Sequence, residues 1–310
     1  MESFRQTNVC MVDPVSFGFN AETAVTNRFQ HAQDAAPNAG KVARAEAATL
    51  ANALRAAGIG VAVAPDTTVP QKPDAVFPNN WVSFHEDGSV VLYPMHNPSR
   101  RAERREAVID CVKSQLGFQE RRRLDLSTEE NHGRFLEGTG SLVLDHAQRL
   151  AFACRSPRTD EALVREWARQ MDYEPVLFDA ATPDGSAVYH TNVVLWIGKN
   201  VAAAGFEWVP SPQRAELLRR LSAQGQRTVI DLRAAQLLAF AGNMLELGDG
   251  QGRRHLVMST AAASSLDADQ SAMIRDAGVQ RLLAAVPTIE RLGGGSVRCM
   301  LAEVPCPRPS

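Results

Sequence analysis

The chain has 310 residues, of which 45% are hydrophobic, and a formal net charge of −2. This composition is enough for one large core or two smaller ones, and it lacks the basic excess that nucleic-acid-binding proteins carry. The two basic runs at 100–105 and 121–123 are interpreted as solvated helix faces. No apolar stretch reaches the ~18 residues of a membrane span, so we expect neither a nucleic-acid nor a membrane partner.

Residues 1–14 lack the basic and then apolar layout of a signal peptide, which predicts a cytoplasmic protein. The five cysteines include no CxxC pair, and no histidine lies at ligand spacing. We therefore expect no disulfides, no metal site and no other cofactor. A homo-oligomer is compatible with the sequence, which does not determine the oligomeric state.

Helical and extended segments recur along the chain in a repeating order. The spacing of about 50–60 residues between helices is close to that of repeat proteins, and the pattern is not a strict alternation of one strand and one helix. The first helix ends at Gly58, and Ser99 is the candidate N-cap of the second. The pattern predicts one α/β domain over 1–310 with five β-rich units. The helices are expected at 39–58, 99–117, 156–171, 211–225 and 265–278, and the strands at 59–65, 89–94, 141–145, 150–155, 192–198, 201–205, 228–232, 243–247, 255–259 and 296–304.

Cys299 follows a run of three glycines, Gly293–Gly295, near the end of the chain. Glycine allows the backbone to adopt positive φ and to approach a ligand closely. A cysteine delivered in this way is a candidate nucleophile, whose active form is the thiolate. A small buried residue in a C-terminal strand is the alternative interpretation.

A nucleophilic cysteine needs a partner that exchanges protons, and His190 is the best candidate. It lies at the start of an apolar strand, two residues before Asn192. Residues i and i+2 of a strand point to the same face, so we expect both side chains to project into one cleft. A structural or solvated histidine remains the alternative.

Two further polar positions precede apolar strands. Glu137 comes before Gly138 and is either a solvated turn residue or the carboxylate that orients a catalytic histidine. Asn79 and Asn80 follow an aromatic–proline pair, where an asparagine pair is also typical of a simple turn.

Taken in order, these motifs resemble the pentein superfamily of guanidine-modifying enzymes. The resemblance rests on "FPNN" at 77–80, "PMHNPSRR" at 94–101, "FLEGTGSLVLD" at 135–145, "YHTNVVLWIG" at 189–198 and "GGGSVRCM" at 293–300. It implies a five-bladed α/β propeller of pseudo-fivefold ββαβ repeats. It also implies that Cys299 is the nucleophile, His190 the general acid and base, and Glu137 its acidic partner.

The sequence departs from the arginine-acting members of the superfamily at two positions. Those members carry aspartates that hold the guanidinium, whereas this chain has Asn80 and Asn192. A buried guanidinium without an anionic partner is destabilised by ~3–5 kcal/mol, but asparagine can both donate to and accept from a neutral ureido group. The resemblance to the citrulline-hydrolysing subgroup therefore predicts a hydrolase that converts citrulline to ornithine, ammonia and carbon dioxide through a covalent sulfur intermediate.

An amino-acid substrate also needs a partner for its α-carboxylate. The "PMHNPSRR" motif resembles the segment that supplies this arginine, which matches Arg100 best and leaves Arg101 as a rival. The planar guanidinium suits a carboxylate because it bonds to both oxygens. A solvated arginine at the start of a helix is the alternative.

Two other functions are compatible with part of this pattern, and a third is excluded. An arginine deiminase, dihydrolase or amidinotransferase would need other carboxylates, such as Asp179 or Asp231, to hold a guanidino substrate. A non-catalytic pentein that binds a partner would not need the Cys299, His190 and Glu137 set. A papain-like peptidase is excluded by order, because its cysteine precedes its histidine.

Overall fold

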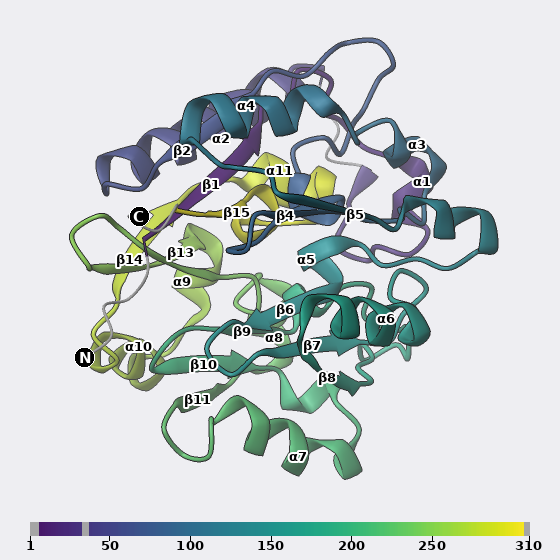
Figure 1. The fold of residues 1–310 in the computed structure, drawn as a ribbon. Coiled ribbons are helices and arrows are strands. Elements are labelled where there is room, and N and C mark those ends of the chain that lie inside the picture. Colours follow the sequence, from purple (N-terminus) through teal and green to yellow (C-terminus); the bar gives the residue numbers. More distant parts are fainter. Residues whose placement is uncertain (1–5, 33–36, 307–310) are drawn as a thin grey trace.

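The structure, a computed structural model, describes residues 6–32 and 37–306 (Figure 1). Residues 1–5 of the stretch in which we looked for a signal peptide therefore lie outside the described residues. Within the described ranges, no helix is both long enough and apolar enough to cross a membrane.

The strands of the described residues form five separate three-stranded sheets. In each sheet the middle strand pairs antiparallel with one neighbour and parallel with the other, and a helix connects the parallel pair. The first unit contains β15 (Ala302–Pro305), β1 (Thr7–Val12), α2 (Ala39–Ala56) and β2 (Val61–Ala64), and the second contains β3 (Val82–Phe84), β4 (Ser89–Leu92), α4 (Glu106–Leu116) and β5 (Arg122–Asp125). The third unit contains β6 (Leu142–Asp145), β7 (Leu150–Cys154), α6 (Glu161–Met171) and β8 (Glu174–Phe178). The fourth contains β9 (Leu195–Ile197), β10 (Val201–Ala204), α7 (Ser211–Leu221) and β11 (Thr228–Asp231), and the fifth contains β12 (Leu245–Gly248), β13 (Arg254–Ser259), α10 (Ala268–Asp276) and β14 (Gln280–Ala284).

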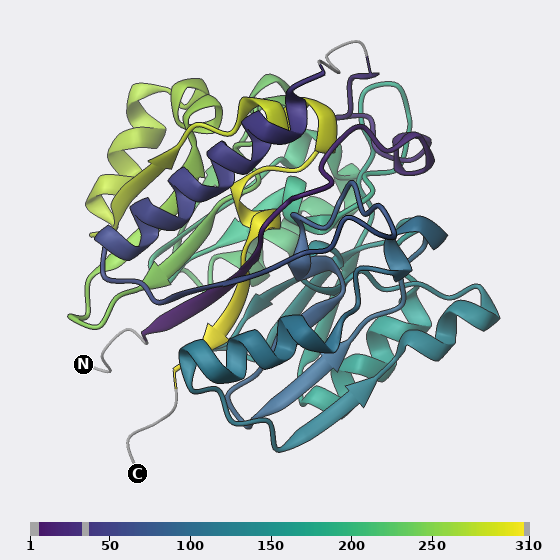
Figure 2. The ribbon, with the colours of Figure 1, turned by 90° about the horizontal axis from the view of Figure 1, so that it is seen from above.

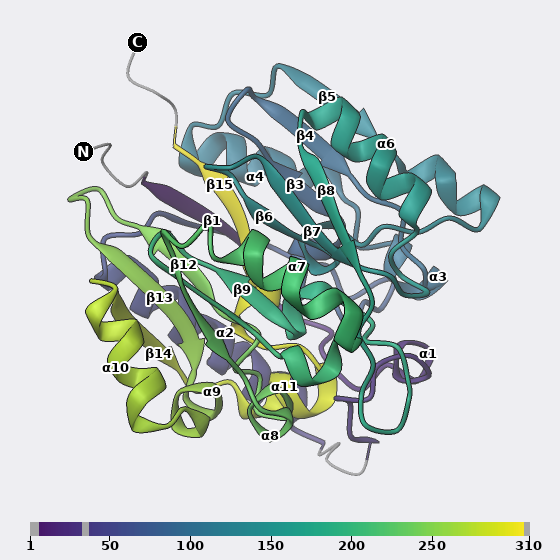
Figure 3. The ribbon, with the colours of Figure 1, turned by 90° about the horizontal axis from the view of Figure 1, so that it is seen from below.

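The predicted α/β class is confirmed, and the described sheets are small and mixed rather than joined into a closed barrel. The long helices lie on the outside: α2 and α4 at the top of Figure 1, α6 at the right, α7 at the bottom and α10 at the left. Figure 3 places β12–β14 and β3–β5 on opposite sides of the molecule. The first unit joins the two ends of the chain, because β1 pairs antiparallel with β15 from Thr7 opposite Pro305 to Cys10 opposite Ala302 (Figure 2).

The buried faces of the helices explain their positions. Leu50 and Leu54 of α2 are fully buried and belong to one apolar cluster with Val9 of β1 and Leu282 of β14. Helix α2 thus covers strands from two neighbouring units. Such burial of leucine contributes about 1.5–3 kcal/mol for each side chain.

Several predicted boundaries were wrong. The second predicted helix is broken into α3 (Pro98–Arg101) and α4, so Ser99 lies inside α3 and is no N-cap; its hydroxyl donates to the Glu22 carboxylate. The third helix begins later than predicted, because Asp160 caps α6 through a bond from the Leu163 N–H. The fifth predicted helix corresponds to α10, which begins three residues later, and α9 (Thr260–Ser265), which was not predicted, precedes it.

The end of the chain also differs from the prediction. The extended segment expected at 296–304 begins only with β15, because Val297–Met300 form the 3₁₀ turn η6. The glycine run closes a helix that was not predicted, α11 (Pro287–Gly293). Five strands were also not predicted: β1, β3, β5, β8 and β14.

Candidate active site

The residues singled out in the sequence lie in short turns at one end of the sheets. Asn80 ends the 3₁₀ turn η2 (Pro78–Asn80) before β3. Glu137 immediately precedes the short helix α5 (Gly138–Ser141) before β6, and His190 immediately precedes the turn η4 (Thr191–Val193) before β9. Cys299 lies in η6 before β15. Because each turn begins a sheet unit, residues far apart in the sequence meet.

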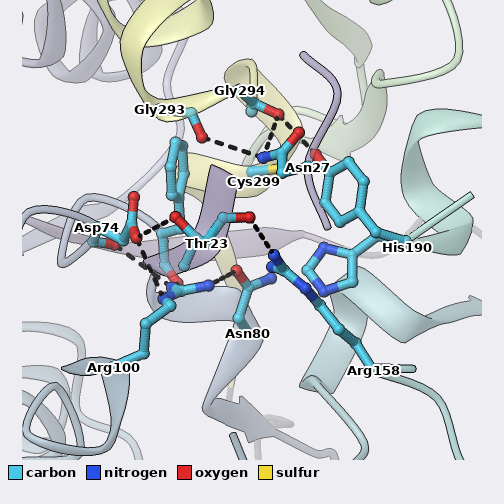
Figure 4. Close-up of a pocket in the computed structure, with 13 residues that line it drawn as sticks. Thr23, Asn27, Asp74, Asn80, Arg100, Arg158, His190, Gly293, Gly294 and Cys299 are labelled. Carbon is cyan, nitrogen blue, oxygen red and sulfur yellow. Dashed lines mark hydrogen bonds and ion pairs between the residues drawn. The ribbon is translucent and has the colours of Figure 1, made fainter. Parts of the chain in front are cut away.

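These turns surround a pocket that contains Cys299, His190, Asn80 and Arg100. Figure 4 shows the thiol and the imidazole on its upper and right-hand sides, with Arg100 and Asp74 on the left. The cavity volume is about 10 Å³, roughly the space that one water needs, so an amino-acid substrate requires side chains to move. The other lining residues are Thr23, Asn27, Phe77, Arg158, Tyr189, Gly293, Gly294 and Gly295.

His190 and Glu137 form a buried pair. The Nε2 atom of His190 lies 2.7 Å from Oε2 of Glu137, and the other oxygen, Oε1, accepts the backbone N–H of His96 at 3.0 Å. Burial lowers the pKa of His190 to about 4 against the attraction of Glu137. Burial would raise the pKa of Glu137, but the charge of Arg158 and the bond to His190 hold it well below its usual range. At neutral pH the pair is a carboxylate that orients a neutral imidazole.

Cys299 is surrounded by amides. Its Sγ lies 3.2 Å from Nδ2 of Asn243 and 3.5 Å from Nδ2 of Asn192. Burial raises the pKa of the thiol, and the hydrogen bond from Asn243 acts in the opposite direction. The Cys299 thiol is therefore neutral in the resting site, and its ionisation requires a base or a change in its surroundings.

The reason given for placing His190 beside Asn192 was wrong, although both residues do belong to this region. They do not lie on a strand, because η4 separates His190 from β9. His190 turns toward Glu137 and the pocket, while the Asn192 amide contacts the sulfur of Cys299. The 3₁₀ turn, and not the alternation of side chains along a strand, determines the directions in which these two side chains point.

Arg100 lines the pocket, but its guanidinium is already engaged. It donates to both carboxylate oxygens of Glu103, at 3.0 and 2.8 Å, and to Oδ1 of Asn80 at 2.8 Å. Burial raises the pKa of Glu103 to about 7 against the attraction of Arg100. Its rival, Arg101, contacts Glu130 and does not line the pocket. The part of Arg100 in holding a substrate carboxylate remains a prediction.

A second buried arginine, Arg158, was missed by sequence analysis. Its Nη2 donates to the Thr23 carbonyl at 3.0 Å, and its guanidinium lies 5.0 Å from the centre of the Tyr189 ring. The third predicted helix included Arg158, and an arginine in that position is expected at the surface. Arg158 lies instead in the turn before α6, and that turn directs it into the pocket.

Asp74 is a pocket carboxylate that sequence analysis also passed over. One oxygen, Oδ2, accepts from Asn20 at 2.7 Å and from Thr23 at 3.2 Å. The other, Oδ1, is buried and has no hydrogen-bond partner among the described residues. Burial raises the pKa of this carboxyl group against the attraction of Arg100. The feature of the sequence that could have identified Asp74 is its position three residues before Phe77, at the start of the stretch that leads into "FPNN".

The glycine run has a steric role that the structure makes specific. A Cβ atom on Gly295 would lie 3.0 Å from the Phe77 ring and 3.3 Å from Cβ of Cys299, and one on Gly293 would lie 2.8 Å from Phe77. The carbonyl of Gly294 accepts from the Tyr189 hydroxyl at 2.5 Å, and its N–H closes α11 by donating to Glu290. The N–H of Gly294 is therefore already bonded and is not available to a ligand.

The four buried cysteines of the described residues, Cys10, Cys111, Cys154 and Cys299, carry free thiols. Only Cys299 among them lines the pocket. Within 6–32 and 37–306, no group of three histidine, cysteine or acidic residues has a geometry that would hold a metal ion.

The fold and the grouping of these turns place the chain in the pentein superfamily of guanidino-modifying enzymes. A model of the family described as "N,N dimethylarginine dimethylhydrolase, eukaryotic" matches residues 13–306, and the chain belongs to this family. No curated protein sequence matches the chain.

Solved structures share the fold at low identity. The N-terminal domain of ArgZ, an arginine dihydrolase from the ornithine–ammonia cycle in cyanobacteria, has a TM-score of 0.74 and 16% identity over 97% of this chain and 99% of that domain. Full ArgZ is longer, and the match spans 41% of it. SxtG, an amidinotransferase from Microseira wollei in the saxitoxin biosynthetic pathway, has a TM-score of 0.71 and 12% identity over 99% of this chain and 97% of that chain. At these identities the likeness concerns the fold.

Proposed function

We propose that the protein is a cysteine-dependent hydrolase of the ureido group of citrulline. The observation that carries this proposal is the charge around the thiol. The groups beside Cys299 are the neutral amides of Asn192 and Asn243, and two buried arginines, Arg100 and Arg158, line the same pocket. Each arginine is paired with a buried carboxylate, Arg100 with Glu103 and Arg158 with Glu137, so the selection comes from the amides. They give a guanidinium no anionic partner beside the thiol, whereas they can bond to a neutral ureido group.

The proposed reaction consumes one water for each citrulline. The thiolate of Cys299 adds to the ureido carbon, and His190, which has taken up the thiol proton, gives a proton to the departing nitrogen. A carbamoyl group, which still carries the second nitrogen, then remains bound to sulfur. His190, oriented by Glu137, removes a proton from water, which attacks this carbon and releases the thiolate and a carbamate. The remaining C–N bond of the carbamate breaks to give carbon dioxide and the second amine. The products are ornithine, ammonia and carbon dioxide, and the pattern does not fix which nitrogen leaves first.

Asn80 has a narrower part in this scheme than the sequence suggested. Its Oδ1 already accepts from Arg100, and its Nδ2 donates to Asn79 at 3.1 Å. One N–H of the amide is left to donate, which suits the carbonyl oxygen of a ureido group and not a guanidinium, which has no acceptor. We propose that Asn80 polarises this carbonyl and that Asn192 orients the ureido nitrogens.

We also propose that the five sheet units are the blades of one propeller that forms a single catalytic domain. The outward position of the helices in Figure 1 supports this arrangement. The substrate would then enter at the end of the sheets where the turns η2, η4 and η6 meet.

A second candidate function is hydrolysis of a guanidino substrate, arginine or a methylated arginine. It is favoured by Asp74, whose unpartnered Oδ1 is a buried anionic acceptor in the pocket. The family name is compatible with this substrate class, as is the structure of AgrE, a neighbour with 15% identity and a TM-score of 0.75, in complex with L-arginine. Asp74 lies on the side of the pocket away from His190 in Figure 4, where it would equally suit the ammonium group of citrulline.

The two functions are separated by measuring ornithine, citrulline and ammonia after incubation with citrulline, arginine, N,N-dimethylarginine, agmatine and succinylarginine. We expect ornithine and ammonia from citrulline and little turnover of the others. Rapid formation of citrulline from arginine would overturn the proposal in favour of the second function.

The double variant Asn80→Asp and Asn192→Asp tests the proposal that neutral amides select a ureido substrate over a guanidino substrate. Two added carboxylates should raise the ratio of kcat/KM for arginine to that for citrulline by at least about tenfold, since an ion pair in a buried site is worth more than one decade. Asn200→Asp, an exposed position outside the pocket, is the matched control. An unchanged ratio in the double variant would refute the argument.

A further inference from the structure

The turns that begin the five sheet units bring one residue each toward the same place. Each such residue lies two or three positions before the first strand of its unit. Three are asparagines, one is glycine and one is the proposed nucleophile: Asn80, Gly140, Asn192, Asn243 and Cys299. Sequence analysis used four of these turns and overlooked Asn243, although "GNMLEL" has the same layout of an asparagine before an apolar strand.

The orientation of the Asn243 amide is fixed by two backbone groups. Its Oδ1 accepts the N–H of Arg298 at 3.1 Å, and its Nδ2 donates to the carbonyl of Asn192 at 2.8 Å. The reverse orientation would set oxygen against oxygen and N–H against N–H. The second hydrogen of Nδ2 therefore faces the sulfur of Cys299, 3.2 Å away.

Asn192 differs from Asn243 because the orientation of its amide is not fixed in the same way. Both Nδ2 and Oδ1 of Asn192 lie near the sulfur, at 3.5 and 3.8 Å, so this amide can face the thiol with either atom and can turn toward a substrate. Neither amide is among the residues that line the pocket in this structure. The three bonds of Asn243, which is fully buried, leave its amide nothing to offer a substrate.

We propose that Asn243 is a catalytic residue that stabilises the Cys299 thiolate through a fixed N–H donor and makes no contact with the substrate. This inference rests on the proposed role of Cys299 as nucleophile. A hydrogen bond to a charged group is roughly twice as strong as one between neutral groups, so the bond strengthens when the thiol ionises. In support, the bond from Asn243 is the largest influence that opposes the raising of the thiol pKa by burial.

The test measures the thiol directly and needs no substrate. The rate at which iodoacetamide alkylates Cys299 is followed against pH, with Cys299→Ala defining the background from other thiols. Asn243→Ala removes the donor, and we expect the midpoint of alkylation to rise by roughly one to two pH units. Asn243→Ser, which restores a small donor, should recover part of the shift, and Asn200→Asp is the control that should leave it unchanged.

Activity supplies the second readout. Because Asn243 is proposed to act on the nucleophile alone, kcat for citrulline should fall at least about tenfold while KM changes by less than about twofold. An unshifted alkylation midpoint in a folded Asn243→Ala variant, checked by circular dichroism, would overturn the inference. Where neither variant folds, NMR of the unsubstituted protein decides: the Asn243 side-chain N–H signals must shift as Cys299 titrates, and invariance contradicts the proposal. Since alkylation does not depend on the substrate, a failure of the citrulline assay leaves this test intact.

Discussion

The chemistry of this protein is concentrated in a few buried polar side chains, each with a different electrostatic setting. Cys299 and His190 both carry pKa values that favour their neutral forms, because burial disfavours charge on either. Glu137 stays ionised because Arg158 and His190 surround it. The resting site is thus a neutral thiol and a neutral imidazole held by a carboxylate, and the proposed mechanism requires a proton transfer between them when the substrate binds.

Replacement of the proposed nucleophile is the first prediction at this scale. Cys299→Ala should reduce citrulline turnover by at least about a thousandfold, since no other thiol of the described residues lines the pocket. Ammonia release in a coupled assay measures the loss. The matched control is Cys154→Ala, a fully buried cysteine outside the pocket, which should lower stability but retain turnover for each folded molecule. Full activity of Cys299→Ala would end the proposed mechanism.

The secondary-structure elements bring residues that are far apart in the sequence together at one site. The short 3₁₀ turns η2, η4 and η6 each lie directly before a strand, so the chain is not extended there. Side chains in these turns therefore point across the end of their sheet and do not follow the alternation of the strand. Tight packing between turns then limits which residues fit. Gly140 in α5 is the clearest case, because it lies against both Asn80 and His190.

A methyl group at Gly140 tests this packing. The added Cβ would lie 2.6 Å from Nδ2 of Asn80 and 2.8 Å from Cε1 and Nδ1 of His190. Gly140→Ala should displace both side chains and lower kcat about tenfold to a hundredfold, as small misplacements of reacting groups do. Gly18→Ala, where a Cβ would meet nothing within 4 Å, is the control. Equal kcat values for the two variants would show that Gly140 does not position the site.

At the scale of the whole molecule, stability depends on polar contacts between units as well as on apolar burial. His85 is one such contact: it lies 2.7 Å from Ser83, whose hydroxyl lies 2.7 Å from that of Tyr93. The Tyr93 hydroxyl in turn accepts the indole N–H of Trp167 at 3.0 Å, which ties the second unit to α6 of the third. Burial lowers the pKa of His85 to about 3.

The pH dependence of stability follows from this lowered pKa. In the unfolded chain His85 binds a proton near pH 6.5, while in the folded state it stays neutral down to about pH 3. Between these values the unfolded state holds the extra proton, so the contribution of His85 falls by about 1.4 kcal/mol per pH unit as the pH drops. The destabilisation caused by His85→Gln, measured by urea unfolding, should therefore shrink from pH 7 to pH 4. A pH-independent difference would contradict the sign.

The amino-acid sequence alone determined the α/β class, the five helix-bearing units and the motifs that place the chain among the penteins. These features are local, because helical periodicity, apolar strands and glycine runs depend on residues close together in the sequence. It also selected Cys299, His190, Glu137 and Asn80, whose turns meet at the pocket.

Only the tertiary structure decided which groups are free to act. Arg100 looked available, but Glu103 and Asn80 already bind it. Asp74 looked ordinary, but folding leaves one of its oxygens buried without a partner among the described residues. Such properties depend on burial and on contacts between distant turns, since desolvation and hydrogen bonding are set by neighbours in space and not by neighbours along the chain.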